Sequence, residues 1–85
     1  MKMVCVSRST DVSTGLRLAG IEAYTINNVN EILPKIEELS NDETVGILGV
    51  TEDINNLFSD EIKAIKQKRE MPLIVTIPNT ILHKR

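Results

Sequence analysis

Four short apolar runs alternate with longer stretches in which apolar residues recur every three or four positions. The third and fourth runs read VGILGV and LIVTI, so their apolar residues are nearly continuous. Such runs are typical of parallel strands covered on both faces, whereas alternating patterns indicate one face in water. The pattern predicts βαβαβαβ, with strands over Met3–Ser7, Ala23–Ile26, Val45–Val50 and Leu73–Ile77.

The first predicted helix runs from about Ser13 to Ala19. Gly20 follows it at the position where many helices end in a left-handed backbone, which glycine adopts without strain. This end would turn the chain back and place Ile21 against Leu16. We therefore expect Gly20 to close this helix.

Apolar residues at helical spacing predict a second helix after Ile26. Its N-cap is Asn28 or Asn30, because an asparagine oxygen accepts a hydrogen bond from the free amides of the first turn. We place Pro34 near the first turn, where a missing N–H is tolerated. The apolar stripe consists of Ile32, Leu33, Ile36 and Leu39.

A third helix is predicted after the third strand, with Thr51 as its N-cap. Ser59 is available to cap a second segment if this helix breaks there. The apolar stripe consists of Ile54, Leu57, Phe58, Ile62 and Ile65.

These elements predict one small α/β domain. Parallel strands joined by a helix cross over right-handed almost without exception, so the pieces assemble as a doubly wound sheet of the Rossmann-like or receiver-like kind. The sheet has four parallel strands with helices on both sides. We expect residues 1–78 to form the domain and 79–85 to form a C-terminal tail.

The composition narrows the function classes. The formal charge of -2 gives no basic excess for nucleic acid, and no apolar run is long enough to span a bilayer. Tyr24 and Phe58 are the only aromatic residues, so surfaces for stacking bases or sugars are not expected. The single Cys5 has no partner for an internal disulfide. We expect a cytoplasmic protein that neither binds nucleic acid nor inserts in the membrane.

The loop at residues 7–14 is the first candidate for chemistry. Ligands of parallel sheets bind beyond the carboxyl ends of the strands, and free amides at a helix N-terminus favour an anion. The loop has neither G-x-G-x-x-G nor G-x-x-x-x-G-K-[ST], and its Ser, Thr and Asp residues are equally those of an N-capped turn. The missing motifs favour capping, and a phosphate-binding loop remains the alternative.

Other catalytic patterns are also incomplete. A receiver-like phosphotransfer site needs several carboxylates at the strand ends to hold a divalent cation, but the first strand ends in Ser7, Arg8 and Ser9. Cys5 lies two residues before the position that a phosphocysteine-like nucleophile would occupy, and burial makes a thiol inert. His83 stands in a terminal HKR segment without partners. We therefore predict no catalytic residue, cofactor or metal.

Charge is unevenly distributed along the chain. Between Glu31 and Glu61 there are nine acidic residues and one basic residue, Lys35. Acidic residues at a helix start and basic residues at its end suit the helix dipole, and steering of a charged partner is the alternative. The basic residues that follow are Lys63, Lys66, Lys68 and Arg69.

Three blocks of the chain resemble the F subunit of the V-type and A-type (vacuolar and archaeal or bacterial) ATPases. They are DVSTGLRLAGI at 11–21, GILGVTEDI at 46–54 and KREMPLIVTIP at 68–78. The resemblance implies a non-catalytic part of the rotary central stalk, which docks on the coiled-coil D subunit. It also implies a place outside the membrane in a complex that couples ATP hydrolysis or synthesis at a catalytic head to proton or sodium ion transport.

Two features depart from the family. Its usual Gly-Asp-x-Asp turn after the first strand is replaced here, with Arg8 and Ser9 at the first two places and only Asp11 retained. Family members continue past the last strand into a C-terminal helix, whereas this chain stops seven residues after Pro78. Contacts that this helix makes in the family are therefore not carried over to this sequence, which is either a truncated piece or a short natural variant.

Polar groups near the strand ends exceed what capping uses, which favours a partner surface. The alternative is a purely structural role, in which Arg17 is a solvated helix residue and Thr51 and Asp11 only cap helices. A second function class is a small phosphate-binding or phosphotransfer domain that uses loop 7–14. The residues predicted to contribute to the stalk interface are Asp11, Thr14, Arg17, Glu52 and Asp53.

Overall fold

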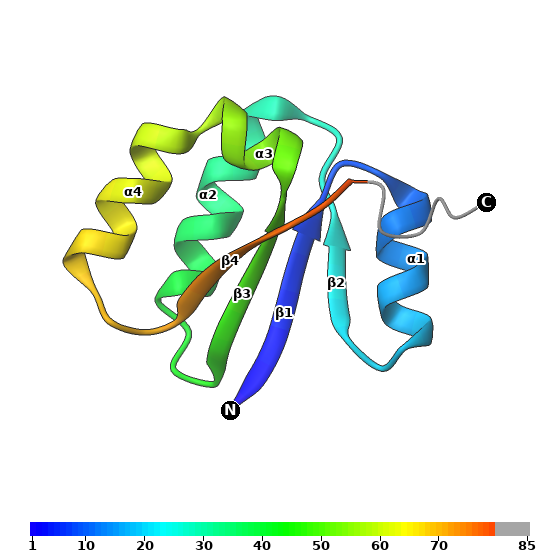
Figure 1. The fold of residues 1–85 in the computed structure, drawn as a ribbon, viewed down its shortest axis with the longest axis horizontal. Helices are drawn as coiled ribbons and strands as arrows, with labels where there is room; N and C mark the ends of the chain where they lie inside the picture. The colour runs from blue at the N-terminus through cyan, green and yellow to red at the C-terminus, as the bar shows by residue number, and fades with distance from the viewer. Residues whose placement is uncertain (80–85) are drawn as a thin grey trace.

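A computed structural model describes residues 1–79 of the chain, as eight helices and strands. Figure 1 shows them in chain order as β1 (Lys2–Ser7), α1 (Thr10–Leu18), β2 (Glu22–Thr25), α2 (Val29–Ser40), β3 (Val45–Thr51), α3 (Glu52–Leu57), α4 (Ser59–Lys68) and β4 (Leu73–Ile77). The C-terminal tail predicted over 79–85 lies outside the described residues, except for Asn79.

The four strands form one parallel sheet in the order β2-β1-β3-β4, which confirms the predicted fold class. Helix α1 covers one face, and α2, α3 and α4 cover the other (Figure 1). The point where the chain changes sides lies between β1 and β3, the two central strands. The carboxyl ends of these strands carry the loops in which a doubly wound sheet places its site.

Two apolar clusters hold the layers together. The larger one joins the sheet to α2, α3 and α4, and includes Leu48 of β3 and Ile36 of α2, both fully buried. The smaller one lies under α1 and includes Cys5, Val12 and Leu16. Because successive side chains of a strand point to opposite faces, β1 contributes Val4 and Val6 to the first cluster and Cys5 to the second.

The first helix begins earlier than predicted, at Thr10 rather than Ser13. Ser9 is its N-cap, because its hydroxyl accepts a hydrogen bond from the Val12 N–H. The predicted end is confirmed: Gly20 has a φ of 89°, and the N–H of Ile21 donates to the Leu16 carbonyl at 2.9 Å.

Asn28 rather than Asn30 caps α2, since its side-chain oxygen accepts the Asn30 N–H at 2.9 Å. The position predicted for Pro34 is wrong, because Pro34 is the sixth residue of α2 and lies beyond the first turn. Its missing N–H leaves the Asn30 carbonyl without its helical partner. The helix continues because Ile32 and Ile36 bind it to the sheet.

The third predicted helix breaks at Phe58 into α3 and α4. The N-cap of α4 is Phe58, so the proposed capping role of Ser59 is wrong. The break also changes which side chains face the sheet: Leu57, predicted in the apolar stripe, is 52% exposed, whereas Phe58 packs against the larger cluster.

Candidate functional site at the carboxyl edge of the sheet

The turn between β1 and α1 uses its hydroxyl groups to start the helix. The Ser9 hydroxyl accepts the Val12 N–H at 3.3 Å, and the Ser7 hydroxyl accepts the Ser9 N–H at 2.9 Å. The Ser9 carbonyl also accepts the Ser13 N–H at 3.1 Å. These bonds satisfy part of the free amides of the first turn, as capping requires. The geometry therefore supports the capping interpretation of loop 7–14.

Arg8 joins two loops at this edge, a role that sequence reasoning missed. Its guanidinium Nη2 donates to the Asn27 carbonyl at 3.1 Å, which ties the β1–α1 turn to the β2–α2 turn. Its Nε is buried without a hydrogen-bond partner in residues 1–79. An arginine directly after a buried strand was the available signal, but only the parallel pairing of β1 with β2 shows which loop it reaches.

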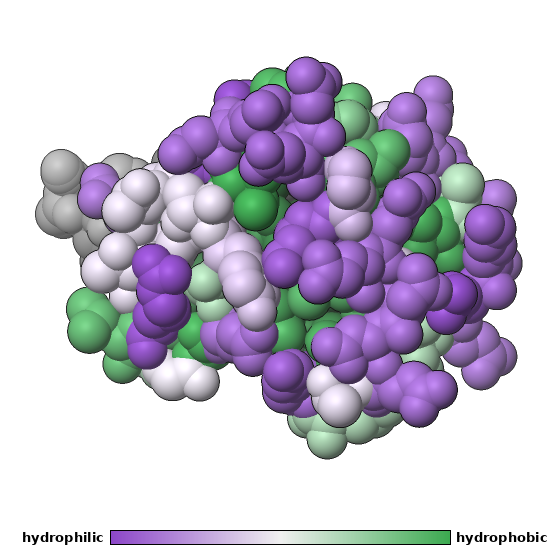
Figure 2. Space-filling model, turned by 180° about the vertical axis from the view of Figure 1, so that it is seen from behind, coloured by the Kyte–Doolittle hydropathy of each residue, from purple (hydrophilic) through white to green (hydrophobic). Residues whose placement is uncertain are grey.

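The three predicted residues on α1 have different surroundings. Asp11 and Thr14 are exposed, and their side chains make no hydrogen bond within the described part of the chain. Asp11 does not cap the helix, since Ser9 does. Arg17 is not simply solvated, because its Nη1 donates to the Ala23 carbonyl of β2 at 3.0 Å. Figure 2, which shows the back of the molecule, has many residues of near-neutral hydropathy on the α1 side, together with a strongly hydrophilic one and a few hydrophobic ones, whereas the opposite side is mostly hydrophilic.

A second polar group forms where β3 enters α3. The Thr51 hydroxyl donates to Asp53 Oδ1 at 2.6 Å, so Thr51 occupies the N-cap position without capping with its side chain. Asn79 supplies the missing cap, because its Oδ1 accepts the Asp53 N–H at 3.0 Å and its Nδ2 donates to Asp53 Oδ1 at 3.0 Å. The Asn79 N–H also donates to Glu52 Oε1 at 3.3 Å. The chain just after β4 therefore caps α3 from outside the helix.

The pKa of Asp53 lies below its ordinary value. Burial acts to raise this pKa, but hydrogen bonds from Thr51, from Asn79 and from backbone N–H groups favour the carboxylate and outweigh burial. Because the folded pKa is depressed, the carboxylate stabilises the fold above the unfolded pKa, and this contribution is lost as the pH falls through the folded pKa.

The ordinary pKa of an aspartate side chain is about 3.9. We predict that the pKa of Asp53, measured from the NMR shift of its side-chain carboxyl carbon between pH 6 and 2, lies below this value. Thr51→Val, which keeps the shape of the buried side chain but removes the hydroxyl donor, should move the midpoint upward. A wild-type midpoint above the ordinary range would mean that burial outweighs the hydrogen bonds and would contradict the prediction.

The structure does not join the two sets of predicted residues directly. Among residues 1–79, no hydrogen bond or ion pair links Asp11, Thr14 or Arg17 to Glu52 or Asp53. The first set lies on α1 and the second at the start of α3, on opposite faces of the sheet, and both helices begin at the carboxyl edge (Figure 1).

Of the remaining candidates for chemistry, Cys5 has a structural role. Cys5 is buried in the smaller cluster, as predicted; burial raises the pKa of its thiol, and the backbone hydrogen bond at Gly49 only partly offsets this. His83 lies outside the described residues. Residues 1–79 form at least four surface hollows, and none of these four is lined by a residue that we predicted for the stalk interface (Asp11, Thr14, Arg17, Glu52 and Asp53).

Within residues 1–79, none of the helices is both long and apolar enough to cross a membrane. The same part of the chain contains no group of three or more His, Cys, Asp or Glu side chains placed to hold a metal ion.

The chain is a small α/β domain. At the carboxyl edge of its sheet, polar residues after the strands cap helices and connect neighbouring loops. Over residues 4–82 the chain matches the sequence model of a family described as the ATP synthase (F/14-kDa) subunit, and it belongs to that family.

Curated relatives agree with this membership. The F subunits of the A-type ATP synthases of Methanococcus maripaludis (strain S2) and Methanocaldococcus jannaschii are each 33% identical to this chain over 70 residues. The match covers 81% of this chain and 66% of each relative. The chain thus spans just under two thirds of the length of these relatives.

Proposed function

We propose that this chain is a non-catalytic F subunit in the central stalk of a V/A-type rotary ATPase. In this role it docks on the coiled-coil D subunit, on the cytoplasmic side of the membrane. Through the stalk it helps couple ATP hydrolysis or synthesis at the catalytic head to proton or sodium ion transport. The observation that carries the proposal is the family match, which runs through all four strands of the sheet.

The contacts at the carboxyl edge support a docking role over a reaction. The Ser9 hydroxyl is engaged with the Val12 amide, and the Asp53 carboxylate is engaged with Thr51 and Asn79. Side chains that are hydrogen-bonded within the chain hold their loops in one conformation. Because such loops lose little conformational entropy on binding, they favour recognition by another protein. These hydrogen bonds also give the alternative, a phosphate-binding loop at 7–14, less support.

The docking surface that we propose contains Asp11, Thr14, Arg17, Glu52 and Asp53. Asp11 and Thr14 are the cleanest probes of it, because both are exposed and neither side chain makes a hydrogen bond in residues 1–79. Arg17, Glu52 and Asp53 also make internal hydrogen bonds, so replacing them changes the fold and the surface together.

Co-expression with a candidate D subunit, followed by size-exclusion chromatography, is expected to give a one-to-one complex. Separate elution of the two chains under conditions where both are folded would contradict the proposed function.

We predict that Asp11→Ala combined with Thr14→Ala weakens binding to the D subunit about tenfold, as loss of a few central contacts does in other interfaces. Isothermal titration calorimetry measures the change, and circular dichroism verifies the fold. The matched control is Asp60→Ala, an exposed carboxylate in the first turn of α4. Equal affinity of the double variant, the control and the wild type would remove Asp11 and Thr14 from the docking surface.

A further inference from the structure

The open edge of β4 is the starting observation. β4 is the last strand of the sheet and pairs with β3 alone in the described residues. Backbone groups on the other edge of such a strand are free to pair with another chain. Proteins protect these edges with charges, prolines or bulges, but β4 reads LIVTI. Pro72 and Pro78 flank the strand without interrupting it.

A groove runs beside this edge, between the end of α4 and the start of β4. Its volume is about 450 Å³. Its lining includes Lys66, Lys68 and Arg69 from the end of α4 and the residue after it, and Pro72, Leu73 and Ile74 from the start of β4 and the residue before it. Leu73 is 56% exposed although it lies within the strand, so the groove offers apolar contact beside free backbone groups.

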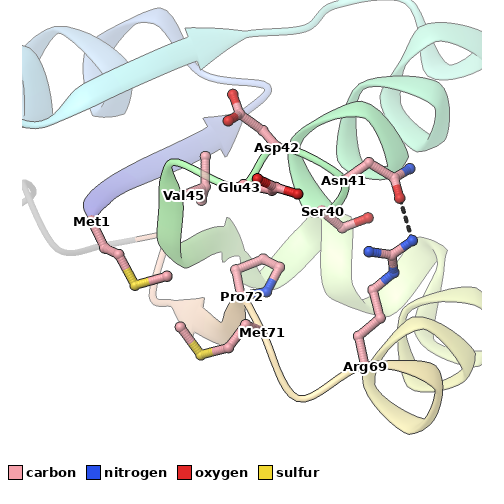
Figure 3. A pocket seen from close by; sticks show the side chains of 9 residues that line it. All are labelled: Met1, Ser40, Asn41, Asp42, Glu43, Val45, Arg69, Met71 and Pro72. Atoms are coloured by element: carbon pink, nitrogen blue, oxygen red, sulfur yellow. Dashed lines mark hydrogen bonds between the residues drawn. The ribbon is translucent and has the colours of Figure 1, made fainter.

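The groove is basic although the whole chain has a formal charge of -2. Lys66 and Lys68 are exposed and form no ion pair in residues 1–79. The Arg69 guanidinium donates to the neutral side chain of Asn41, beside a smaller hollow whose lining includes Met71 (Figure 3). Glu70 is the only acidic residue in the lining of the groove. The lining of the groove therefore has three basic side chains and one carboxylate, and Glu37 lines a neighbouring hollow together with Lys68 and Arg69.

We propose that this groove binds an acidic, extended segment of another protein, which adds to β4 as a fifth strand. The free backbone groups of β4 supply the hydrogen bonds of strand addition, which are independent of sequence. Because alternate side chains of the added strand face the α4 side, acidic residues at these positions would meet Lys66 and Lys68. This surface lies at the amino end of β4, opposite the carboxyl edge proposed for docking on the stalk, so the inference does not depend on the proposed function.

The test uses the full chain labelled with ¹⁵N and a capped octapeptide of alternating Glu and Val. Amide shifts are expected to concentrate at residues 66–70 and 73–77, and hydrogen exchange of β4 amides on the free edge should slow at least threefold. A peptide with Lys in place of Glu should bind at least tenfold more weakly at low salt. Absence of shifts at β4 with the acidic peptide, or equal binding of both peptides, would overturn the proposal.

Two further comparisons separate strand addition from simple charge attraction. Lys66→Glu with Lys68→Glu should weaken binding of the acidic peptide about tenfold, whereas Lys63→Glu, on the same helix but outside the groove lining, should leave it within about twofold. An acidic peptide N-methylated at alternate positions cannot pair along one edge and should lose binding. Unchanged affinity of the methylated peptide would refute strand addition. Slowed exchange at β4 on raising protein concentration without peptide would identify a second copy as the occupant and refute the acidic partner.

Discussion

Leu48→Ala is expected to lower the free energy of unfolding by about 2–5 kcal/mol, the range for removing a large aliphatic side chain from a core. Leu48 is fully buried in the central strand β3, where it faces the helices α2 and α4 in the larger cluster. Small domains have free energies of unfolding of about 5–15 kcal/mol, so this substitution removes a large share. Urea denaturation followed by circular dichroism measures the loss.

Ile47→Ala is the matched control for this prediction. Ile47 is the preceding residue of the same strand, but its side chain lies on the opposite face and is 38% exposed. The expected loss is about 1 kcal/mol, because much of the side chain already contacts water. Equal losses for the two variants would contradict the assignment of the faces of β3.

Asn79→Ala is expected to lower the free energy of unfolding by about 1–2 kcal/mol, the upper part of the range for lost N-caps. The Asn79 side chain makes two hydrogen bonds to Asp53 and so holds the end of β4 against the start of α3. Its removal leaves the Asp53 N–H and carboxylate without these partners. Chemical denaturation gives the free energy, and hydrogen exchange should show faster exchange at the start of α3.

Asn56→Ala provides the control, since Asn56 is exposed on α3 and its side chain makes no hydrogen bond in residues 1–79. Its effect should stay within about 0.5 kcal/mol. A double-mutant cycle between Asn79→Ala and Asp53→Ala should give a coupling energy of at least about 0.5 kcal/mol. Additive effects would show that the two side chains do not act together.

The two proposed surfaces begin at opposite ends of the sheet. The proposed stalk-docking surface begins at the carboxyl ends of β1 and β3, whereas the basic groove begins at the amino end of β4. The two proposals are tested independently, because one experiment measures a complex with the D subunit and the other measures the binding of a peptide at β4.

The strands were the most predictable part of the fold. β4 has the bounds expected from its apolar run, and β3 is one residue longer than expected. All residues of β3 except Ile47 are buried, so the composition of this strand directly indicates its burial. The apolar run of β4 predicted the strand correctly but not its burial, because β4 is an edge strand in which only Ile74 and Ile77 are buried. The helix end at Gly20 was equally predictable, because the turn after the helix requires a left-handed backbone at this residue.

The helix starts were less predictable because several residues compete for the same cap. Ser9 and Asn28 have neighbours with equal capping propensity, and the choice depends on where each strand ends. No glycine or proline near Phe58 indicates in the sequence that the helix breaks there. Packing of Phe58 and Ile62 against the sheet accompanies the break, and it leaves Leu57 in water.

The order of apolar runs and helical stripes was enough to define the βαβαβαβ fold, because each element records its burial in its own residues. The contacts of Arg8 with Asn27 and of Asn79 with Asp53 came only from the tertiary structure. These residues stand 19 and 26 positions apart, and no local pattern encodes their meeting. Pairing of parallel strands brings their carboxyl ends to one edge, and this assembly decides which polar groups cap a helix, which tie loops together and which remain free for a partner.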